Sequence, residues 1–292
     1  MQDPLIERPG ELLVAGHVNV DRFFTVRSFP APDRTVPIIR SRVCLGGTAA
    51  NLALVAARYG VATGLIARIG DGFPREFLTR LRQANIDLRA LVPVPGAVTP
   101  TCYTVEDEQG HQRTLIDQGA MAGMNTATPP RDVLADYSWL HITTGNPQYH
   151  LRLLREARKR GLRAAADPAQ EIHYWWGRSG FRELLAGAEI LFGNRSEIAR
   201  ATKLAGVATT ERLVERVPLV IRTEGSEGVT AFARGNVVHV PAARPRRVRS
   251  IVGAGDAFRG GFYAGWFEGR PLKECLIAGT RSAARWVAGP EE

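Results

Sequence analysis

The sequence has few of the features that mark membrane, secreted or metal-binding proteins. No apolar run approaches the roughly 18 residues that a membrane-spanning helix needs. The three cysteines (Cys44, Cys102 and Cys275) lie far apart and lack metal-ligand spacing, which favours a reduced compartment over a disulfide framework. Residues 1–10 carry Asp3 and Glu7 and do not show the basic-then-apolar order of a signal peptide. We therefore expect a cytoplasmic protein with no membrane contact.

Several well-known nucleotide and metal motifs are also absent. Lysine is scarce, and none of Lys159, Lys203 and Lys273 follows a glycine, so no Walker A loop is present. A dinucleotide fingerprint is excluded because Phe258 stands where the third glycine after Gly253 belongs. No His-Glu-x-x-His pair occurs, which removes the commonest zinc hydrolase pattern.

The chain is strongly basic, with a formal net charge of +9 and a pI of about 10.1. Such a charge is compatible with nucleic acid or with a small anionic substrate. The arginines are spread along the whole chain, and only the stretch 244–249 concentrates them, so we do not expect nucleic acid as a partner. The positive charge of that stretch either raises the local electrostatic potential and so attracts ATP, or the stretch is simply a solvent-exposed strand.

Strand-like and helix-like segments alternate through the second half of the chain. Short apolar runs such as 139–143, 163–166 and 219–222 are separated by amphipathic helical segments, which predicts a mostly parallel sheet covered on both faces. The segments 101–105 and 112–116 flank a polar turn and predict a β-hairpin. We expect a three-layer α/β/α fold in which this hairpin belongs to a small inserted β-sheet that acts as a lid.

One glycine-rich loop has the composition of an anion site beside a base. Gly253, Ala254, Gly255 and Asp256 open a predicted helix, where free amide groups and the helix dipole attract anions. A carboxylate in that turn can accept the proton of a hydroxyl, which is the arrangement that phosphoryl transfer to an alcohol requires. The structural alternative is that Asp256 only caps its helix.

Five short motifs, taken in order along essentially the whole chain, resemble the PfkB, or ribokinase-like, family of carbohydrate and nucleoside kinases. They are Gly16-His17-Val18-Asn19-Val20-Asp21, Gly46-Gly47-Thr48-Ala49-Ala50-Asn51, Asn194-Arg195-Ser196-Glu197, Thr223-Glu224-Gly225-Ser226-Glu227-Gly228 and Gly253-Ala254-Gly255-Asp256. The resemblance implies one ribokinase-like domain over residues 1–292, with lid strands from about 19–45 and 97–120.

The resemblance also implies roles for individual residues, with ATP as co-substrate and Mg²⁺ as cofactor. Asp256 would be the catalytic base, and the backbone of Gly253, Ala254 and Gly255 would form the anion hole. The substrate would be held by Asn19, Asp21, Gly46, Gly47 and Asn51. The nucleotide would be bound by Asn194, Thr223, Gly225 and Gly228. Glu197 would hold the magnesium ion through water, as this ion keeps several of its waters.

The chain departs from the family pattern just before the glycine-rich loop. Most members have an Asp-Thr-Thr-like stretch there, whose Asp helps to bind a potassium-type ion, whereas this chain has Ser250-Ile251-Val252. The substitution leaves monovalent-cation activation open.

The substrate is less clearly indicated. Residues 117–121, 143–147 and 167–171 look most like those of archaeal-type nucleoside kinases, which phosphorylate the 5′-hydroxyl of ribonucleosides. Phe23, Tyr103 and Met121 are lid residues that either contact a base or pack against their neighbours. A ribokinase- or fructokinase-like sugar kinase is the alternative, and a catalytically inactive relative that binds a ligand or nucleic acid is a more distant one. Pairing of two lids into a homodimer is also left open.

Overall fold

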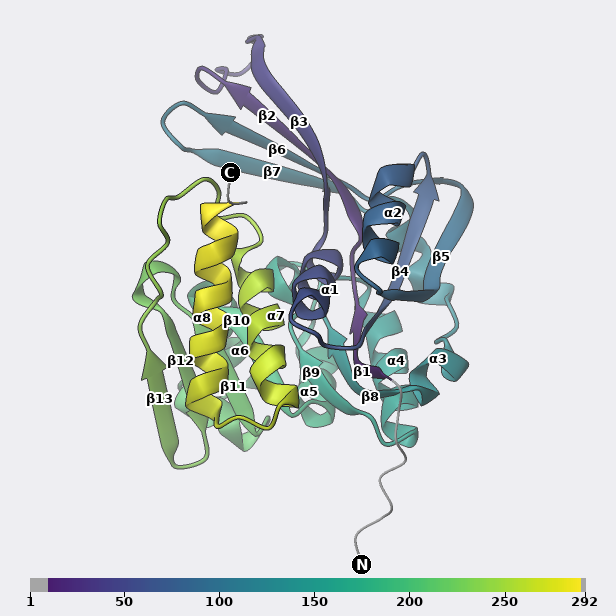
Figure 1. The fold of residues 1–292 in the computed structure, drawn as a ribbon, viewed down its shortest axis with the longest axis vertical. Helices are drawn as coiled ribbons and strands as arrows, with labels where there is room; N and C mark the ends of the chain where they lie inside the picture. The colour runs from purple at the N-terminus through teal and green to yellow at the C-terminus, as the bar shows by residue number, and fades with distance from the viewer. Residues whose placement is uncertain (1–9, 290–292) are drawn as a thin grey trace, which may run out of the picture.

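The computed structural model describes residues 10–289 as two β-sheets of unequal size with helices packed on the larger one (Figure 1). The large sheet has nine strands in the order β13-β12-β11-β10-β9-β8-β1-β4-β5. Its strands are β1 (Gly10–Ala15), β4 (Thr63–Asp71), β5 (Asp87–Val98), β8 (Tyr137–Ile142), β9 (Arg163–Ala166), β10 (Ile190–Asn194), β11 (Leu219–Thr223), β12 (Val229–Ala233) and β13 (Asn236–Val240). All neighbours from β5 to β11 are parallel, and only β12 runs in the opposite direction, antiparallel to both β11 and β13, so the expected mostly parallel sheet is confirmed.

Helices cover both faces of this sheet. The front face in Figure 1 carries α1 (Thr48–Arg58), α2 (Arg75–Gln83), α7 (Ala254–Phe267) and α8 (Leu272–Ala288). The other face carries α3 (Arg131–Ala135), α4 (Pro147–Lys159), α5 (Arg178–Gly187) and α6 (Arg195–Ala205). Four 3₁₀ turns complete the described chain: η1 (Gly119–Thr126), η2 (Ala169–His173), η3 (Glu211–Glu215) and η4 (Gly225–Glu227).

The alternation along β1 shows how the two hydrophobic layers arise. Leu12 and Val14 point into the layer under α1 and α7, whereas Leu13 and Ala15 point into the layer under α4. All four side chains are fully buried. A strand covered on both faces therefore reads as a continuous apolar run, as the sequence does here.

The small sheet projects from one end of the large one, with strand order β3-β2-β6-β7. Its strands are β2 (Asn19–Val26), β3 (Ile38–Gly46), β6 (Thr101–Asp107) and β7 (Gln112–Asp117). The segments expected to supply lid strands thus pair with each other, and the predicted β6–β7 hairpin is present. Strand β5 was not predicted, because Pro93, Pro95 and Gly96 interrupt its pattern.

The connections identify where a ligand is expected. From β1 the chain passes to β4 on one side of the sheet, and later from β8 to β9 and β10 on the other. The strand order therefore reverses between β1 and β8, and open α/β sheets bind ligands beyond the carboxyl ends of the strands at such a point. Residues 16–19 and 143–145 lie at those ends. No helix within residues 10–289 is both long and apolar enough to cross a membrane.

Candidate active site

Asp256 lies in the first turn of α7, in a loop that only glycine can begin. Gly253 adopts a left-handed conformation with φ 79°, and a side chain there would collide with the indole ring of Trp286. The same indole donates from Nε1 to the carbonyl of Val252 at 2.7 Å. Trp286, near the end of α8, therefore packs against the loop and restrains its backbone.

The amide groups of this turn are not equivalent. The N–H of Ala254 donates to the carbonyl of Ile251 at 3.1 Å and closes the loop on itself. The N–H groups of Gly255 and Asp256 have no acceptor among residues 10–289. The N–H of Ala254 is therefore engaged within the loop in this structure, while those of Gly255 and Asp256 remain available to an anion.

The carboxyl group of Asp256 is buried, with 8% of the residue exposed. Burial raises its pKa to about 7, and the nearby Arg259 guanidinium opposes the shift. Asn51 on α1 donates from Nδ2 to Oδ2 of Asp256 at 3.1 Å. No hydrogen-bond partner of Oδ1 lies in the described part of the chain, so this oxygen is the one that can accept a proton. A carboxyl group with a pKa near neutrality suits general-base chemistry.

Asn19 and Asp21 lie at the start of β2, where the chain leaves the large sheet for the small one. Oδ1 of each is buried without a hydrogen-bond partner in the described chain. Burial raises the pKa of Asp21 to about 6, against the lowering effect of Arg42. Buried polar atoms are almost always paired, so unpaired acceptors point to a hydrogen-bonding ligand. Gly46, which lies against Asp21, leads directly into α1, and Asn51 of α1 bonds Asp256, so the two carboxylates lie near the same end of that helix.

Two glycines make room for this pair of acceptors. A Cβ on Gly46 would lie 2.0 Å from Oδ2 of Asp21. Gly47, with φ 92°, caps α1, and a Cβ there would lie 2.3 Å from the carbonyl oxygen of His17. The structure thus gives both glycines a packing reason that the sequence did not reveal.

Asn194 and Glu197 form reciprocal hydrogen bonds at the start of α6. The side chain of Asn194 accepts from the N–H of Glu197 at 2.9 Å, and Glu197 Oε2 accepts from the N–H of Asn194 at 2.7 Å. Oε1 of Glu197 accepts from Nε2 of Gln170 at 2.9 Å. Burial, followed by the charge of Asp167, raises the pKa of Glu197. This reciprocal capping fixes the carboxylate at the carboxyl end of β10.

The segment 223–228 lies beside Asn194, because Asn194 and Thr223 are register partners in neighbouring parallel strands. Gly225 has φ 61° and no atom within 4 Å of its ideal Cβ position, so open space lies over it. Gly228 has φ 113°, and a Cβ there would lie 2.1 Å from the carbonyl oxygen of Val240. An ion pair between Arg195 and Glu227 ties the segment to α6.

No group of three or more His, Cys, Asp or Glu side chains within residues 10–289 converges as a direct metal site. Each oxygen of Glu197 already accepts one hydrogen bond and keeps room for a second. The donor set therefore fits an ion that is held through its own water molecules, which is the usual behaviour of Mg²⁺.

Sequence reasoning missed Arg259, which lies one turn after Asp256. Only 5% of this residue is exposed, and its guanidinium pairs with Asp167 at the end of β9. Burial opposes ionisation of Asp167, but Arg259 and then His141 hold its pKa below the ordinary value. His141 Nδ1 is bonded to the hydroxyl of Tyr263 at 2.6 Å. Arg259 is the one charged residue in the apolar run 257–267, which was an available signal.

A second buried polar cluster, also missed, joins the base of the small sheet to the large one. His17 Nε2 donates to Oε1 of Gln118 at 2.5 Å, and Gln118 Nε2 donates to Glu171 at 3.3 Å. Glu171 in turn accepts from the N–H of Gly145 at 2.5 Å. Burial raises the pKa of Glu171 to about 7 and lowers that of His17 to about 4. Gln118 directly follows β7, so this chain of bonds fixes one root of the small sheet.

The three residues considered for base contacts lie in different places. Phe23 is on the same face of β2 as Asp21, since strand side chains alternate. Tyr103 pairs with Arg22 and therefore lies on the opposite, outer face. Met121 is 1% exposed and belongs to the core. Only Phe23 remains as a candidate base contact.

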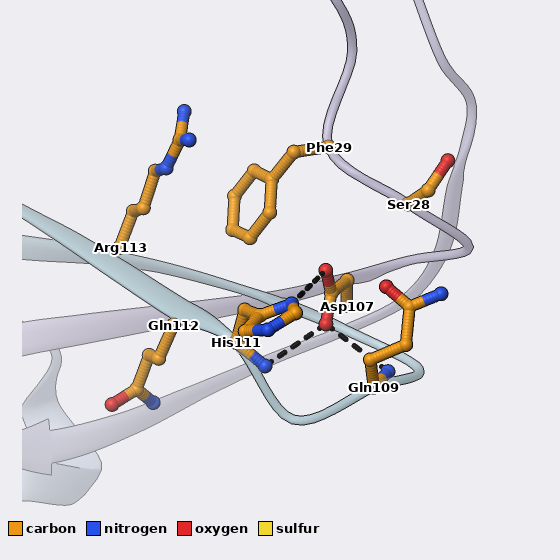
Figure 2. Close-up of a pocket in the computed structure, with 7 residues that line it drawn as sticks. All are labelled: Ser28, Phe29, Asp107, Gln109, His111, Gln112 and Arg113. Atoms are coloured by element: carbon orange, nitrogen blue, oxygen red, sulfur yellow. Dashed lines mark hydrogen bonds and ion pairs between the residues drawn. The ribbon is translucent and has the colours of Figure 1, made fainter.

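The pocket in Figure 2 lies at the far tip of the small sheet. It is lined by Ser28, Phe29, Asp107, Gln109, His111, Gln112 and Arg113. Asp107 uses both oxygens within its own hairpin, accepting from Gln109 and His111. Asp107 is the strand partner of Val26, which lies five positions along β2 from Asp21. The pocket is therefore distant from Asp21 along the sheet, and none of its lining residues is a predicted site residue.

Comparisons with known proteins give matches along nearly the whole described chain. Residues 10–289 match the family model described as pfkB family carbohydrate kinase. A nucleoside kinase of Methanothermobacter thermautotrophicus is 32% identical over 91% of this chain and 85% of that protein. A cytidine kinase of Thermococcus kodakarensis is 31% identical over 94% of each. The crystal structure of Methanocaldococcus jannaschii nucleoside kinase, an archaeal member of the ribokinase family, matches with a TM-score of 0.88 at 27% identity, covering 95% of this chain and 91% of that one.

Proposed function

Because the chain belongs to the pfkB family of carbohydrate kinases, we propose that it transfers the γ-phosphate of ATP to the 5′-hydroxyl of a ribonucleoside. The family makes it a phosphotransferase with an alcohol group as acceptor, and implies ATP as co-substrate. The relatives named as nucleoside and cytidine kinases support the choice of acceptor. The observation that carries the proposal is the pair of unpartnered buried acceptors on Asn19 and Asp21, near the same end of α1 as Asp256.

Those acceptors suit vicinal hydroxyls such as those of a ribose ring, because a carboxylate and an amide oxygen can each take a hydroxyl hydrogen. The surface next to them combines small and apolar side chains with one aromatic ring. Cys44 and Cys102 are the register partners of Asp21, and Ile116 pairs with Cys102 on the same face. Phe23 follows along β2, with the Arg42 guanidinium 3.8 Å from its ring centroid. A planar base attached to the ribose would cover this surface, whereas a free sugar has nothing to place there.

In the proposed reaction Asp256 takes the proton of the acceptor hydroxyl as that oxygen attacks the γ-phosphorus. Asn51 keeps Oδ2 occupied, so Oδ1 receives the proton. The N–H groups of Gly255 and Asp256 stabilise the charge on the transferred group. Asn194, Thr223, Gly225 and Gly228 bind the nucleotide, and Gly253 shapes the turn. Glu197 would hold Mg²⁺ through water, and this ion would offset phosphate charge when bound.

The direct test is ADP release with MgATP over a panel of ribonucleosides, ribose, ribose 1-phosphate and fructose. We expect turnover with at least one nucleoside and much weaker turnover with free sugars. Activity on ribose or fructose and on no nucleoside would instead establish the sugar-kinase alternative. Asp256→Asn is the matched variant, and we expect it to fold and to lose roughly 10³-fold or more in kcat. Activity of that variant close to the wild type would remove the assignment of the base.

We further propose that the small sheet pairs with that of a second copy. Its outer face exposes apolar side chains: Val43 and Tyr103 are 51% and 37% exposed, and Leu115 is 72% exposed. These three are cross-strand neighbours through Arg22. Light scattering should give a dimer mass for the wild type and a monomer mass for Leu115→Lys. A wild-type monomer at micromolar concentration would exclude this arrangement.

The three free thiols support a reducing, cytoplasmic location for this activity. Cys275 is buried, whereas Cys44 and Cys102 flank Asp21 in the small sheet.

A further inference from the structure

One edge of the Arg259 guanidinium is paired with a carboxylate, whereas the third nitrogen has no acceptor in the described chain. Nη2 donates to Oδ1 of Asp167 at 2.6 Å, and Nε contacts Oδ2 of the same carboxylate. The third nitrogen, Nη1, has no acceptor among residues 10–289. A guanidinium carries five N–H donors in a rigid planar fork, so pairing along one edge leaves the remaining donors pointing elsewhere.

The position of Nη1 is fixed by the turn that opens α7. A Cβ built on Gly255 would lie 2.7 Å from Nη1, so this nitrogen lies against the backbone of Gly255. Gly255 is also one of the two residues whose amide groups have no acceptor in the described chain. Nη1 and these amides therefore lie at the first turn of α7, the turn that also carries Asp256.

The arginine is held rigidly in this position. Its partner Asp167 lies 3.5 Å from Nε2 of His141, whose other nitrogen is bonded to Tyr263. Every member of this network is buried, with Arg259 the most exposed at 5%. The carboxylates of Asp167, Asp256 and Glu197 all act on the Arg259 charge, in that order. The guanidinium is thus anchored by Asp167 against the turn that carries the proposed base.

We propose that Arg259 is a catalytic residue whose Nη1 donates a hydrogen bond to a non-bridging oxygen of the phosphoryl group while that group is transferred. The inference rests on the proposed function, with Asp256 as base. The acceptor oxygen forms a bond to the γ-phosphorus, and the bond from that phosphorus to the β,γ-bridging oxygen breaks. The hydroxyl proton moves to Oδ1 of Asp256, the electron pair of the broken bond stays on ADP, and Arg259 keeps its proton throughout.

Such an arginine would stabilise the transition state through a positive charge that is already in position. A positive donor that is fixed before the reaction needs no reorganisation when charge develops on the transferred group. Arginines that serve phosphoryl transfer in other enzymes contribute about 10³–10⁵ in kcat. A buried position with a carboxylate anchor would achieve this without a residue supplied by a mobile lid.

The competing explanation is that Arg259 only neutralises the buried charge of Asp167. Removing one partner of a buried ion pair is strongly destabilising, so Arg259→Ala alone is uninformative if it unfolds. The double variant Arg259→Gln with Asp167→Asn removes both charges and leaves amides of similar shape. If Arg259 is merely a counter-ion, this variant will turn over like the wild type. If Nη1 contacts the phosphoryl group, kcat falls roughly 10²-fold or more with little change in the KM for the nucleoside.

Arg259→Lys is the second variant, because it keeps the charge and is less disruptive. A single ammonium group cannot pair with Asp167 and reach past Gly255 at once, so we again expect a large loss in kcat. Calorimetry adds a binding readout: both variants should bind ADP normally but bind ADP with aluminium fluoride and nucleoside much more weakly. A wild-type kcat in either folded variant overturns the inference. Wild-type inactivity on every acceptor would instead overturn the proposed function, and an active Asp256→Asn would overturn the base alone.

Discussion

Asn51 and Asp256 are 205 positions apart in the sequence, yet the amide of the first donates to Oδ2 of the second at 3.1 Å. The bond crosses from α1 to α7, two helices that pack on the same face of the sheet. It leaves Oδ1 as the oxygen available to the acceptor hydroxyl in the proposed reaction. Asn51 would therefore orient the proposed base, in addition to any contact that it makes with a substrate.

The ionisation of Asp256 should set the acidic limb of the pH profile. The base must be ionised, and burial raises its pKa to about 7. We expect kcat/KM for the nucleoside, measured at saturating MgATP, to rise about tenfold per pH unit below neutrality and to level off above it. Asp21, with its pKa raised to about 6, should steepen the profile at lower pH. A profile that stays flat down to pH 5 contradicts the assignment.

Replacing Asn51 should shift the acidic limb of the pH profile of kcat/KM. Asn51→Ala removes a donor to the ionised carboxylate, so the pKa of Asp256 should rise and the limb should shift upward by about one pH unit. Since the substrates titrate identically in both proteins, the shift must come from the enzyme. Asn236→Ala, at an exposed turn of β13, is the matched control and should leave the profile unchanged. An unshifted limb in a folded Asn51→Ala protein would show that the bond does not control the base.

Gly46 should be needed for substrate affinity through Asp21. In Gly46→Ala the new Cβ would lie 2.0 Å from Oδ2 of Asp21 and must displace that carboxylate. We expect KM for the nucleoside to rise about tenfold or more, with KM for ATP little changed. Gly177→Ala is the control, since no atom lies within 4 Å of its Cβ position and its φ is −83°. Equal kinetics in the two variants would exclude the proposed role of Asp21.

Asp256 should also weaken the fold at high pH. Its folded pKa of about 7 lies above the ordinary carboxyl value, so the folded state binds the proton more tightly than the unfolded state. The resulting decrease in the free energy of unfolding is absent below about pH 4 and fully present above about pH 7. Asp256→Asn removes it, so we expect the variant to have a higher Tm at pH 8, by on the order of 5 °C, and a smaller gain at pH 5. Calorimetry at both pH values measures this difference, and a variant that is less stable at pH 8 contradicts it.

Much of the fold followed from local patterns. The alternation of apolar runs with amphipathic helices predicted the parallel sheet, because strands covered on both faces must be apolar throughout. The turn at Gly253 and the acidic residue three positions later predicted an anion site beside a base; the structure shows that these residues open α7, and their roles stay a prediction. Strand β5 escaped prediction, since its prolines and glycine obscure the pattern and its pairing with β4 is a tertiary contact.

The sequence by itself determined which residue types stand at the ends of strands and helices, because turn chemistry and capping depend on neighbours along the chain. Only the tertiary structure decided how those residues meet. It joined Asn51 to Asp256, opened space for Asp21 at Gly46, and buried Arg259 against Asp167 with one nitrogen beside Gly255. These relationships depend on helices packing across a sheet, over distances that no local pattern encodes. The same packing removes water from the site, and this burial raises the pKa of Asp256 to about 7.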